Sequence, residues 1–201
     1  MLSIILLWKI NSFAFSFCNF LKSIEFPENP QFESISKYMF YYSSLRRIKI
    51  PAKVKQIEEL AFFGLPKLEK LEFSEKSELS IIGSHSFWRC SELVNIAFPS
   101  SLTEIQLFAF SECSKLKYVE FAPDSKLKCI EKGAFSHTAL KEFIIPSNLT
   151  TIMDGAFESC KNLLIIEIPS NSMLRHFSQN IFGKQSQAIV MISSEVSSSI
   201  H

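Results

Sequence analysis

The stretch Ile105–Phe121, IQLFAFSECSKLKYVEF, decides the fold because the rest of the chain repeats its pattern, I-x-x-x-A-F-x-x-C-x-x-L-x-x-V-x-F. The phenylalanine at position 110 returns every 22 to 25 residues, and the full series is Phe15, Phe40, Phe62, Phe87, Phe110, Phe135, Phe157 and Phe182. A period in the twenties with leucine-rich columns is typical of a solenoid, in which each repeat buries its apolar face by stacking on its neighbours.

Each repeat contains a run with the spacing of a β-strand. A leucine five or six residues after the phenylalanine opens an L-x-x-I-x-I run, as in Leu45–Ile50 and Leu163–Ile168. Its last three residues alternate apolar, variable and apolar, which indicates a strand with one buried face. Proline lacks a backbone donor and suits a strand end, and it closes most of these runs, at Pro27, Pro51, Pro99, Pro146 and Pro169.

The segment around the phenylalanine predicts a short helical turn. In Ile105–Cys113 the apolar residues follow the isoleucine at offsets of four, five and eight. These offsets would place their side chains on one side of a helix. We therefore expect each repeat to hold a strand, a turn, a short extended piece and about one turn of helix, which together make an α/β repeat solenoid that is mostly β.

Composition fits a single array. The chain has 201 residues, of which 47% are hydrophobic and 20% charged, and its net charge is +1. This length supports one core, and we predict about eight repeats over residues 1–192 with a polar tail over 193–201. Because the charge is near zero and the basic residues are dispersed, no nucleic-acid partner is expected. No run reaches the roughly 18 apolar residues of a transmembrane segment, so none is expected.

The apolar start, Met1–Ile10, has two interpretations. It resembles the core of a signal peptide, but a basic beginning and an A-x-A-like cleavage site are missing. It also matches the repeat in register, since Leu7–Ile10 aligns with Leu79–Ile82 and Leu127–Ile130. We favour a repeat fragment on this match.

The columns I-x-x-x-A-F-x-x-C-x-x-L-x-x-I-x-I-P, with connectors such as Pro99–Ile105, resemble the BspA-like class of leucine-rich repeats over about residues 7–182. The resemblance implies a right-handed superhelix with a parallel sheet on one face and short helical turns. It also implies a surface-antigen type of protein, at the cell surface or secreted, which binds a host or matrix protein. Cytoplasmic localisation stays open, because no clear signal peptide is present.

Reactive side chains show no catalytic or metal-binding pattern. Four of the five cysteines stand three residues after the phenylalanine, where other repeats have Leu65 or Thr138. Such a column accommodates a small or apolar buried group. We therefore expect all five thiols to be free, and the four in the column to react slowly because they are buried. No C-x-x-C, G-x-S-x-G or H-E-x-x-H motif occurs. We therefore expect no enzyme activity, no cofactor and no metal.

The variable position of each strand points to a binding face. These positions lie side by side on the open face of the sheet, and the residues are Glu25, Lys49, Glu72, Ala97, Glu120, Ile144 and Glu167. One interpretation is solubility and strand register, since charges of alternating sign pair across strands. The other is a protein-binding face with a basic patch at Arg46, Arg47 and Lys49 and an apolar patch at Ile144, Leu164 and Ile165.

Three functions compete. The first is a non-catalytic, adhesin-like binding module, the second an intracellular protein-interaction scaffold, and the third an enzyme, which no residue pattern supports. Compartment separates the first two, and the sequon Asn148–Thr150 would carry a sugar only on a secretory route. Long connectors, such as the one holding Pro123, Asp124 and Ser125, alternate with short ones. They are either a trace of duplication, which we favour, or ligand-contacting loops on the rim that would rival the open face.

Overall fold

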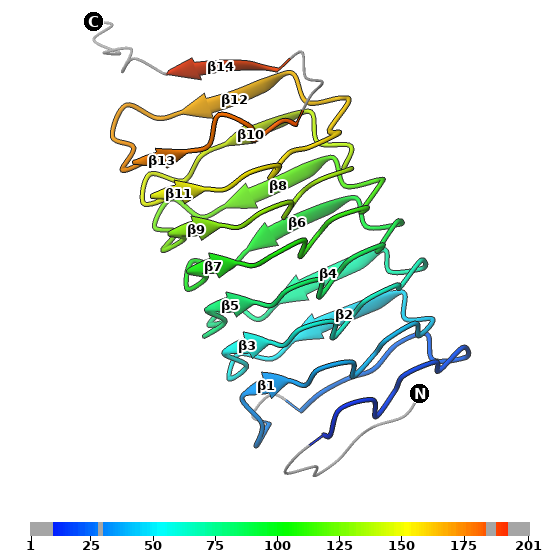
Figure 1. Ribbon diagram of the computed structural model, residues 1–201. Coiled ribbons are helices and arrows are strands. Elements are labelled where there is room, and N and C mark those ends of the chain that lie inside the picture. Colours follow the sequence, from blue (N-terminus) through cyan, green and yellow to red (C-terminus); the bar gives the residue numbers. More distant parts are fainter. Residues whose placement is uncertain (1–9, 28–29, 184–187, 193–201) are drawn as a thin grey trace, which may run out of the picture.

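The computed structural model describes residues 10–27, 30–183 and 188–192, and this part of the chain winds into a parallel β solenoid of about seven turns (Figure 1). One side of the coil is a seven-stranded parallel sheet in the order β1-β3-β5-β7-β9-β11-β13. Its strands have two residues each, and they are β1 (Ser34–Ile35), β3 (Gln56–Ile57), β5 (Ile81–Ile82), β7 (Glu104–Ile105), β9 (Cys129–Ile130), β11 (Thr151–Ile152) and β13 (His176–Phe177).

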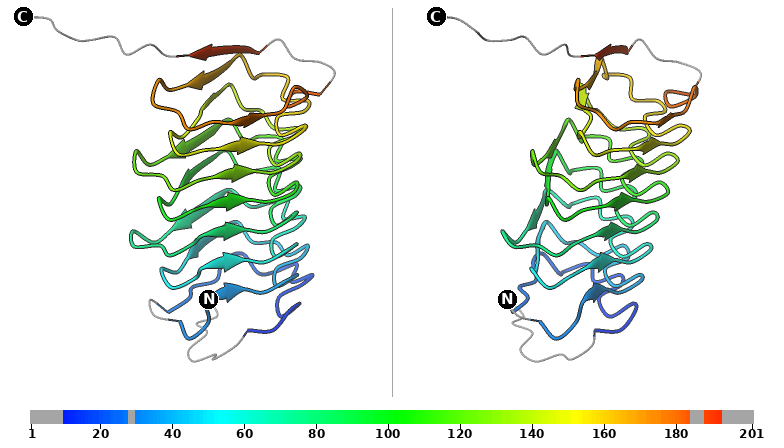
Figure 2. Two further views of the ribbon diagram at one scale, coloured as in Figure 1. Left: turned by 60° about the vertical axis from the view of Figure 1, so that its left-hand side comes forward. Right: turned by 90° about the vertical axis from the view of Figure 1, so that its left-hand side faces the viewer.

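The L-x-x-I-x-I runs form the second column of strands, as predicted. They pair in parallel as three short sheets, β2-β4, β6-β8 and β10-β12-β14, rather than as one. Figure 2 shows the two columns on different sides of the coil. The strands are β2 (Arg47–Ile50), β4 (Lys70–Phe73), β6 (Asn95–Phe98), β8 (Tyr118–Phe121), β10 (Glu142–Ile144), β12 (Ile165–Ile168) and β14 (Ile189–Ile192).

The register of the second column matches the repeat alignment. Lys49 pairs with Glu72, Ala97 with Glu120, and Ile144 with Glu167. The short extended piece predicted before each phenylalanine forms one strand of the seven-stranded sheet. The isoleucines of these strands are buried, as at Ile57, Ile82 and Ile105. Each repeat therefore contributes one strand to each column.

The helical turn predicted for each repeat is not confirmed, because no helix occurs among the residues that the structure describes. Phe108 and Glu112 have positive φ values of 51° and 58°, which interrupt a right-handed helix. Ala109 and Ser111 donate their N–H groups to the carbonyls three residues earlier. Phe110 instead donates across to Ala134 of the next turn, at 2.8 Å. Consecutive β-turns thus replace the helix.

The predicted phenylalanine column forms the core. Phe110 is fully buried and stacks on Phe87 and Phe135, with ring centroids 5.1 and 5.6 Å apart. From Phe15 to Phe157 the neighbouring rings are parallel within 10°, at 4.9 to 6.0 Å. The last repeat differs from the prediction, because Ile181 is buried there while Phe182 stays half-exposed.

Three further expectations stay predictions. Parallel crossovers are right-handed in about 98% of proteins, so a right-handed coil is still expected. Ile10 is buried, as its repeat register requires. The rest of the predicted N-terminal fragment and the polar tail at 193–201 lie outside the described residues. The single array over residues 1–192 stays a proposal, which the turns in the described part of the chain support.

The phenylalanine stack generates a stability prediction. Phe110→Ala should lower the free energy of unfolding by about 3–5 kcal/mol, because it empties a large core site between two stacked rings. The measurement is a urea titration. Phe20→Ala is the control, since Phe20 is 96% exposed, and it should change the free energy by no more than about 0.5 kcal/mol. A loss below about 1 kcal/mol for Phe110→Ala would contradict the stacked core.

Candidate protein-binding face

The open face of the second column is built by strand alternation. In β2, Ile48 and Ile50 point into the core while Arg47 and Lys49 are exposed. Successive side chains of a strand point to opposite faces, so the same positions of the other strands continue this open face along the array. Its side chains rest on a parallel ladder and a stacked core, which hold them in fixed positions.

The basic patch, Arg46, Arg47 and Lys49, is partly neutralised. Arg46 donates its Nη1 to Glu69 Oε1 at 2.6 Å, and both side chains are about half exposed. Glu72, which pairs with Lys49 across the strands, is held by Lys70 at 2.8 Å. Within the described part of the chain, Arg47 and Lys49 have no ion pair. These two side chains therefore carry the positive charge that a partner would meet.

The apolar patch, Ile144, Leu164 and Ile165, lies on the neighbouring strands β10 and β12, with Leu164 directly before β12. Ile144 and Leu164 are 56% and 59% exposed, and Ile165 is half-buried. Ile165 pairs with Glu142, and Leu164 donates its backbone N–H to Lys141 O at 2.9 Å. The structure thus brings the three predicted residues together, with acidic side chains at their margin.

The two patches do not meet. Strands β4, β6 and β8 lie between β2 and β10, which at 4.7–4.9 Å per strand places the patches roughly 20 Å apart. A partner that uses both must be a folded surface or a long segment, because a small ligand cannot span that distance. The face is therefore suited to a macromolecule.

Sequence reasoning missed a hollow on the same face. Where the strand column divides between β8 and β10, the surface sinks into a space of about 590 Å³. Tyr118 and Glu120 line it from one side and Glu142 and Ile144 from the other. Tyr118 is 42% exposed, and Lys141 Nζ lies 5.8 Å from its ring centre. Aromatic residues anchor many interfaces, so an exposed tyrosine at a strand position was the available signal.

A second groove runs along the turns beside the phenylalanine column. Its volume is about 750 Å³, and Tyr42, Arg89, Glu112 and His137 come from successive turns to line it. Arg89 Nε donates to Glu112 Oε2 at 2.7 Å, and this bond holds the pKa of the Glu112 carboxyl below its usual value. We name it the turn groove, and its Arg89 and Glu112 side chains are paired with each other.

The cysteine column is confirmed as free and mostly buried. Cys90, Cys113 and Cys160 are buried, while Cys18, expected to be buried with them, is half-exposed. Each buried thiol donates to a carbonyl of the preceding turn, as Cys113 Sγ does to Phe87 O at 3.2 Å. The column thus favours a small hydrogen-bond donor, which accounts for cysteine better than apolar character alone.

One cluster of titratable side chains lies on the seven-stranded sheet. Burial, followed by hydrogen bonding to Glu104, raises the pKa of Glu131, whose Oε2 accepts the Leu107 N–H at 2.8 Å. Burial, with the charges of Glu131 and Glu104, raises the pKa of the nearby Cys129 to about 11. The thiol therefore stays protonated at neutral pH, and a protonated thiol is a poor nucleophile.

Within the described ranges, no group of three or more His, Cys, Asp or Glu side chains could hold a metal ion. These ranges also contain no helix that is long and apolar enough to cross a bilayer. The chemistry that the surface does offer is charge, exposed apolar area and an aromatic ring on a rigid sheet.

Comparison with known proteins fits this geometry. The family described as BspA type leucine-rich repeat region matches in six copies, over residues 6–93 and 80–199. A leucine-rich repeat protein from Bacteroides ovatus is 30% identical with a TM-score of 0.77, over 92% of this chain and 46% of its own. No relative was found among curated proteins.

Two further solved structures are similar. The pneumococcal vaccine antigen PcpA is 28% identical with a TM-score of 0.59, over 70% of this chain and 35% of its own. The leucine-rich repeat protein of T. pallidum is 26% identical with a TM-score of 0.56, over 61% of this chain and 58% of its own. This chain therefore spans about a third to three fifths of the proteins it resembles.

The thiols generate a prediction about reactivity. In the native protein at pH 8, Cys90, Cys113 and Cys160 should resist iodoacetamide, while Cys18 reacts first because it is half-exposed. Cys129 should react slowly, and its rate should rise with pH towards about 11, since only the thiolate attacks.

The measurement is mass spectrometry of peptides after timed alkylation, with the urea-unfolded chain as the control in which all five react. A Cys90–Cys113 disulfide in freshly isolated protein, or a Cys129 that reacts as fast as Cys18, would contradict this account.

Proposed function

We propose a binding function for this chain, which belongs to the BspA-type leucine-rich repeat family. It acts as a non-catalytic module that binds another protein through the open face. The observation that carries the proposal is the exposure of Ile144 and Leu164 on a rigid strand face. Exposed apolar side chains of this size, ringed by charges, are typical of the centre and rim of a protein interface.

The face has the extent that a partner needs. A standard interface covers about 800 Å² on each side, and several adjacent strands provide this area. Tyr118 and the hollow beside it offer a site into which a partner side chain can insert. Arg47 and Lys49 would steer an acidic partner during encounter, whereas the apolar patch would supply the desolvated anchor.

A surface or secreted location is part of the proposal. It is supported by the similarity to PcpA, which is described as a vaccine antigen, and an adhesin-like role with a host or matrix protein follows from that location. The second candidate is an intracellular scaffold that uses the same face. Asn148 separates them, because its sequon would carry a sugar in a secretory route, although its Nδ2 donates to Ser125 O at 2.8 Å.

Location is tested by protease treatment of intact cells that make the full-length protein. Loss of the protein without cell lysis supports the surface assignment, and recovery from the medium supports secretion. Full protection, with no sugar on Asn148, would favour the intracellular scaffold.

The binding face generates a mutational prediction. With a partner recovered by pull-down, Ile144→Ser with Leu164→Ser should weaken binding by more than 2 kcal/mol, about 30-fold in Kd, because it removes the apolar anchor. Arg46→Glu with Arg47→Glu should mainly slow association and reduce its salt dependence. Both are measured by surface plasmon resonance at two salt concentrations.

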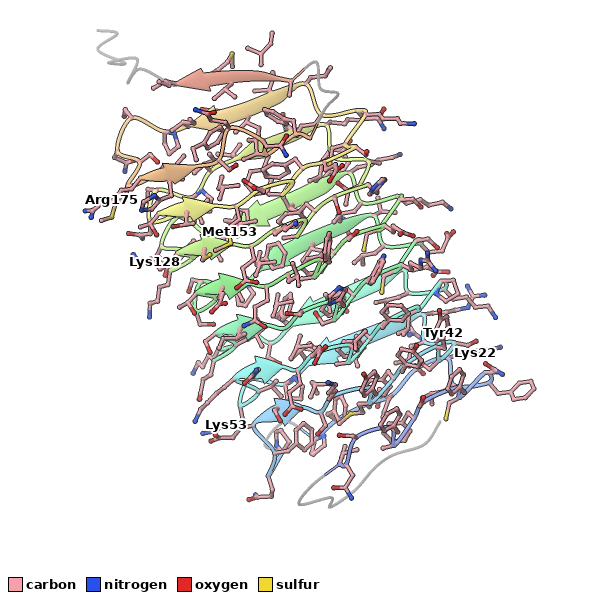
Figure 3. All side chains as sticks on the ribbon, viewed as in Figure 1. Lys22, Tyr42, Lys53, Lys128, Met153 and Arg175 are labelled. Carbon is pink, nitrogen blue, oxygen red and sulfur yellow. The ribbon has the colours of Figure 1, made fainter. Side chains whose placement is uncertain are left out.

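Matched controls lie next to the strands of the opposite, seven-stranded sheet, before β9 and after β11. Met153→Ser removes a side chain that is 41% exposed, and Lys126→Glu with Lys128→Glu reverses two exposed charges; Figure 3 shows Met153 and Lys128 near β9 and β11. Neither control should change binding. If binding survives both face variants and is lost on altering Pro123, Asp124 and Ser125, the rim connector is the recognition surface instead.

A further inference from the structure

The hollow between β8 and β10 has an apolar floor. The two strands belong to separate short sheets, and further turns lie on both sides of them (Figure 1). Val119 and Phe121 of β8 line the hollow and are half-buried. Their partners in β6, Ile96 and Phe98, are only 2% and 4% exposed. The division of the strand column therefore opens a part of the core wall that is covered one turn earlier.

Two unpaired carboxylates line the same hollow. Glu120 of β8 and Glu142 of β10 are both exposed. Their partners across the strands, Ala97 and Ile165, carry no charge. In the part of the chain that the structure describes, neither carboxylate has an ion pair. The hollow thus combines uncompensated negative charge with an apolar floor.

An aromatic ring completes the lining. Tyr118 is 42% exposed and lies at the start of β8. The Nζ of Lys141 lies 5.8 Å from its ring centre, within the range of a cation–π interaction. Lys141 makes no ion pair with a carboxylate among the described residues. The ring is therefore accessible to a cation.

We propose that the hollow binds an arginine side chain of the protein partner. This inference rests on the proposed function, because the hollow is part of the open face. A guanidinium stacks on an aromatic ring and forms two parallel hydrogen bonds to a carboxylate. Tyr118 provides the ring, and Glu120 and Glu142 provide the carboxylates. The aliphatic stem of the arginine lies on Val119 and Phe121, as long charged side chains do on apolar surface.

Arginine fits these groups better than other side chains do. A lysine ammonium is a compact charge, which neither stacks flat on a ring nor forms the paired hydrogen bonds. An acidic side chain would be repelled by the two carboxylates, and an uncharged one would leave them buried without a cation. Tyrosine and arginine are also among the residues that contribute most to the binding energy of interfaces.

The arginine site gives the open face a polarity. Arg47 and Lys49 place unpaired positive charge at β2, and β8 lies three strands further along, roughly 14 Å away. Between them, Lys70 and Glu72 of β4 neutralise each other at 2.8 Å. The partner therefore needs an acidic group opposite β2 and an arginine opposite β8 and β10. A partner bound the other way round would meet like charges, so the hollow also fixes its orientation.

The test is an NMR titration of the full chain with N-acetylarginine amide, which needs no identified partner. The probe should bind saturably, with a Kd in the millimolar range that is usual for so small a ligand, and should shift the backbone amides of β8 and β10. N-acetylcitrulline amide has nearly the same shape without the charge, and it should bind at least about tenfold more weakly. N-acetyllysine amide should also bind more weakly than the arginine probe.

Three variants test the lining residues. Glu120→Gln with Glu142→Gln removes the charge at nearly constant volume, and Tyr118→Leu removes the ring but keeps an apolar side chain. Each should weaken binding of the arginine probe by about fivefold or more. Lys141→Gln should strengthen it by about twofold, because it removes a cation that competes for the ring. A gain of binding cannot result from misfolding.

Two controls change similar side chains away from the hollow. Tyr42→Leu replaces a tyrosine that is 39% exposed, against 42% for Tyr118, and Glu75→Gln removes an exposed carboxylate in a connector. Neither should change binding of the probe. Circular dichroism melting shows whether each variant is folded, and the comparison of the arginine and citrulline probes on the unchanged chain needs no variant.

Equal binding of the arginine and citrulline probes, shifts confined to other strands, or no effect of the three variants would overturn the inference. Its failure is separable from that of the proposed function. If the probe binds as expected but the partner still binds after Ile144→Ser with Leu164→Ser, the proposed function fails and the arginine site remains. If the partner depends on Ile144 and Leu164 but no probe enters the hollow, this inference fails alone.

Discussion

The backbone of the segment around each buried phenylalanine divides its hydrogen bonds between its own turn and the next. Ala109 and Ser111 close local turns, whereas Phe108, Phe110 and Glu112 donate to the following turn. This alternation sets the distance between successive turns, and the phenylalanine rings then stack in parallel at nearly that distance. Left-handed residues at Phe108 and Glu112 make the alternation possible. A single side chain that disturbed it would disturb both neighbouring turns, since no turn has a core of its own.

Much of this architecture could be predicted from the sequence, because columns of a repeat are visible as a period. The strand positions, the pairing of Lys49 with Glu72 and the burial of Phe110 follow from aligning the repeats. The helical turn did not follow, because offsets of four, five and eight fit either a helix or two consecutive β-turns. The positive φ at Phe108 distinguishes the β-turns from a helix, and an aromatic side chain does not indicate that its residue has a positive φ.

The candidate site was predictable in position but less so in character. Alignment places Arg46 and Ile144 on the open face, yet it gives no pairing of side chains, so the neutralisation of Arg46 by Glu69 appears only in the structure. The hollow beside Tyr118 depends on where the strand column divides, which is a property of several turns together. Strand β14 was not predicted because its repeat lacks the leucine that opens the other strand runs, although it follows β12 by 24 residues, within the usual spacing of 23 to 25.

The same rule that stabilises the array also determines where it can interact. An internal turn buries its apolar residues between two neighbours, so substitutions on its open face cost little in stability and can adapt to a partner. The face therefore offers side chains that vary from turn to turn on a backbone that does not vary. Recognition of a distinct protein needs this variation, because only varied side chains discriminate between partners.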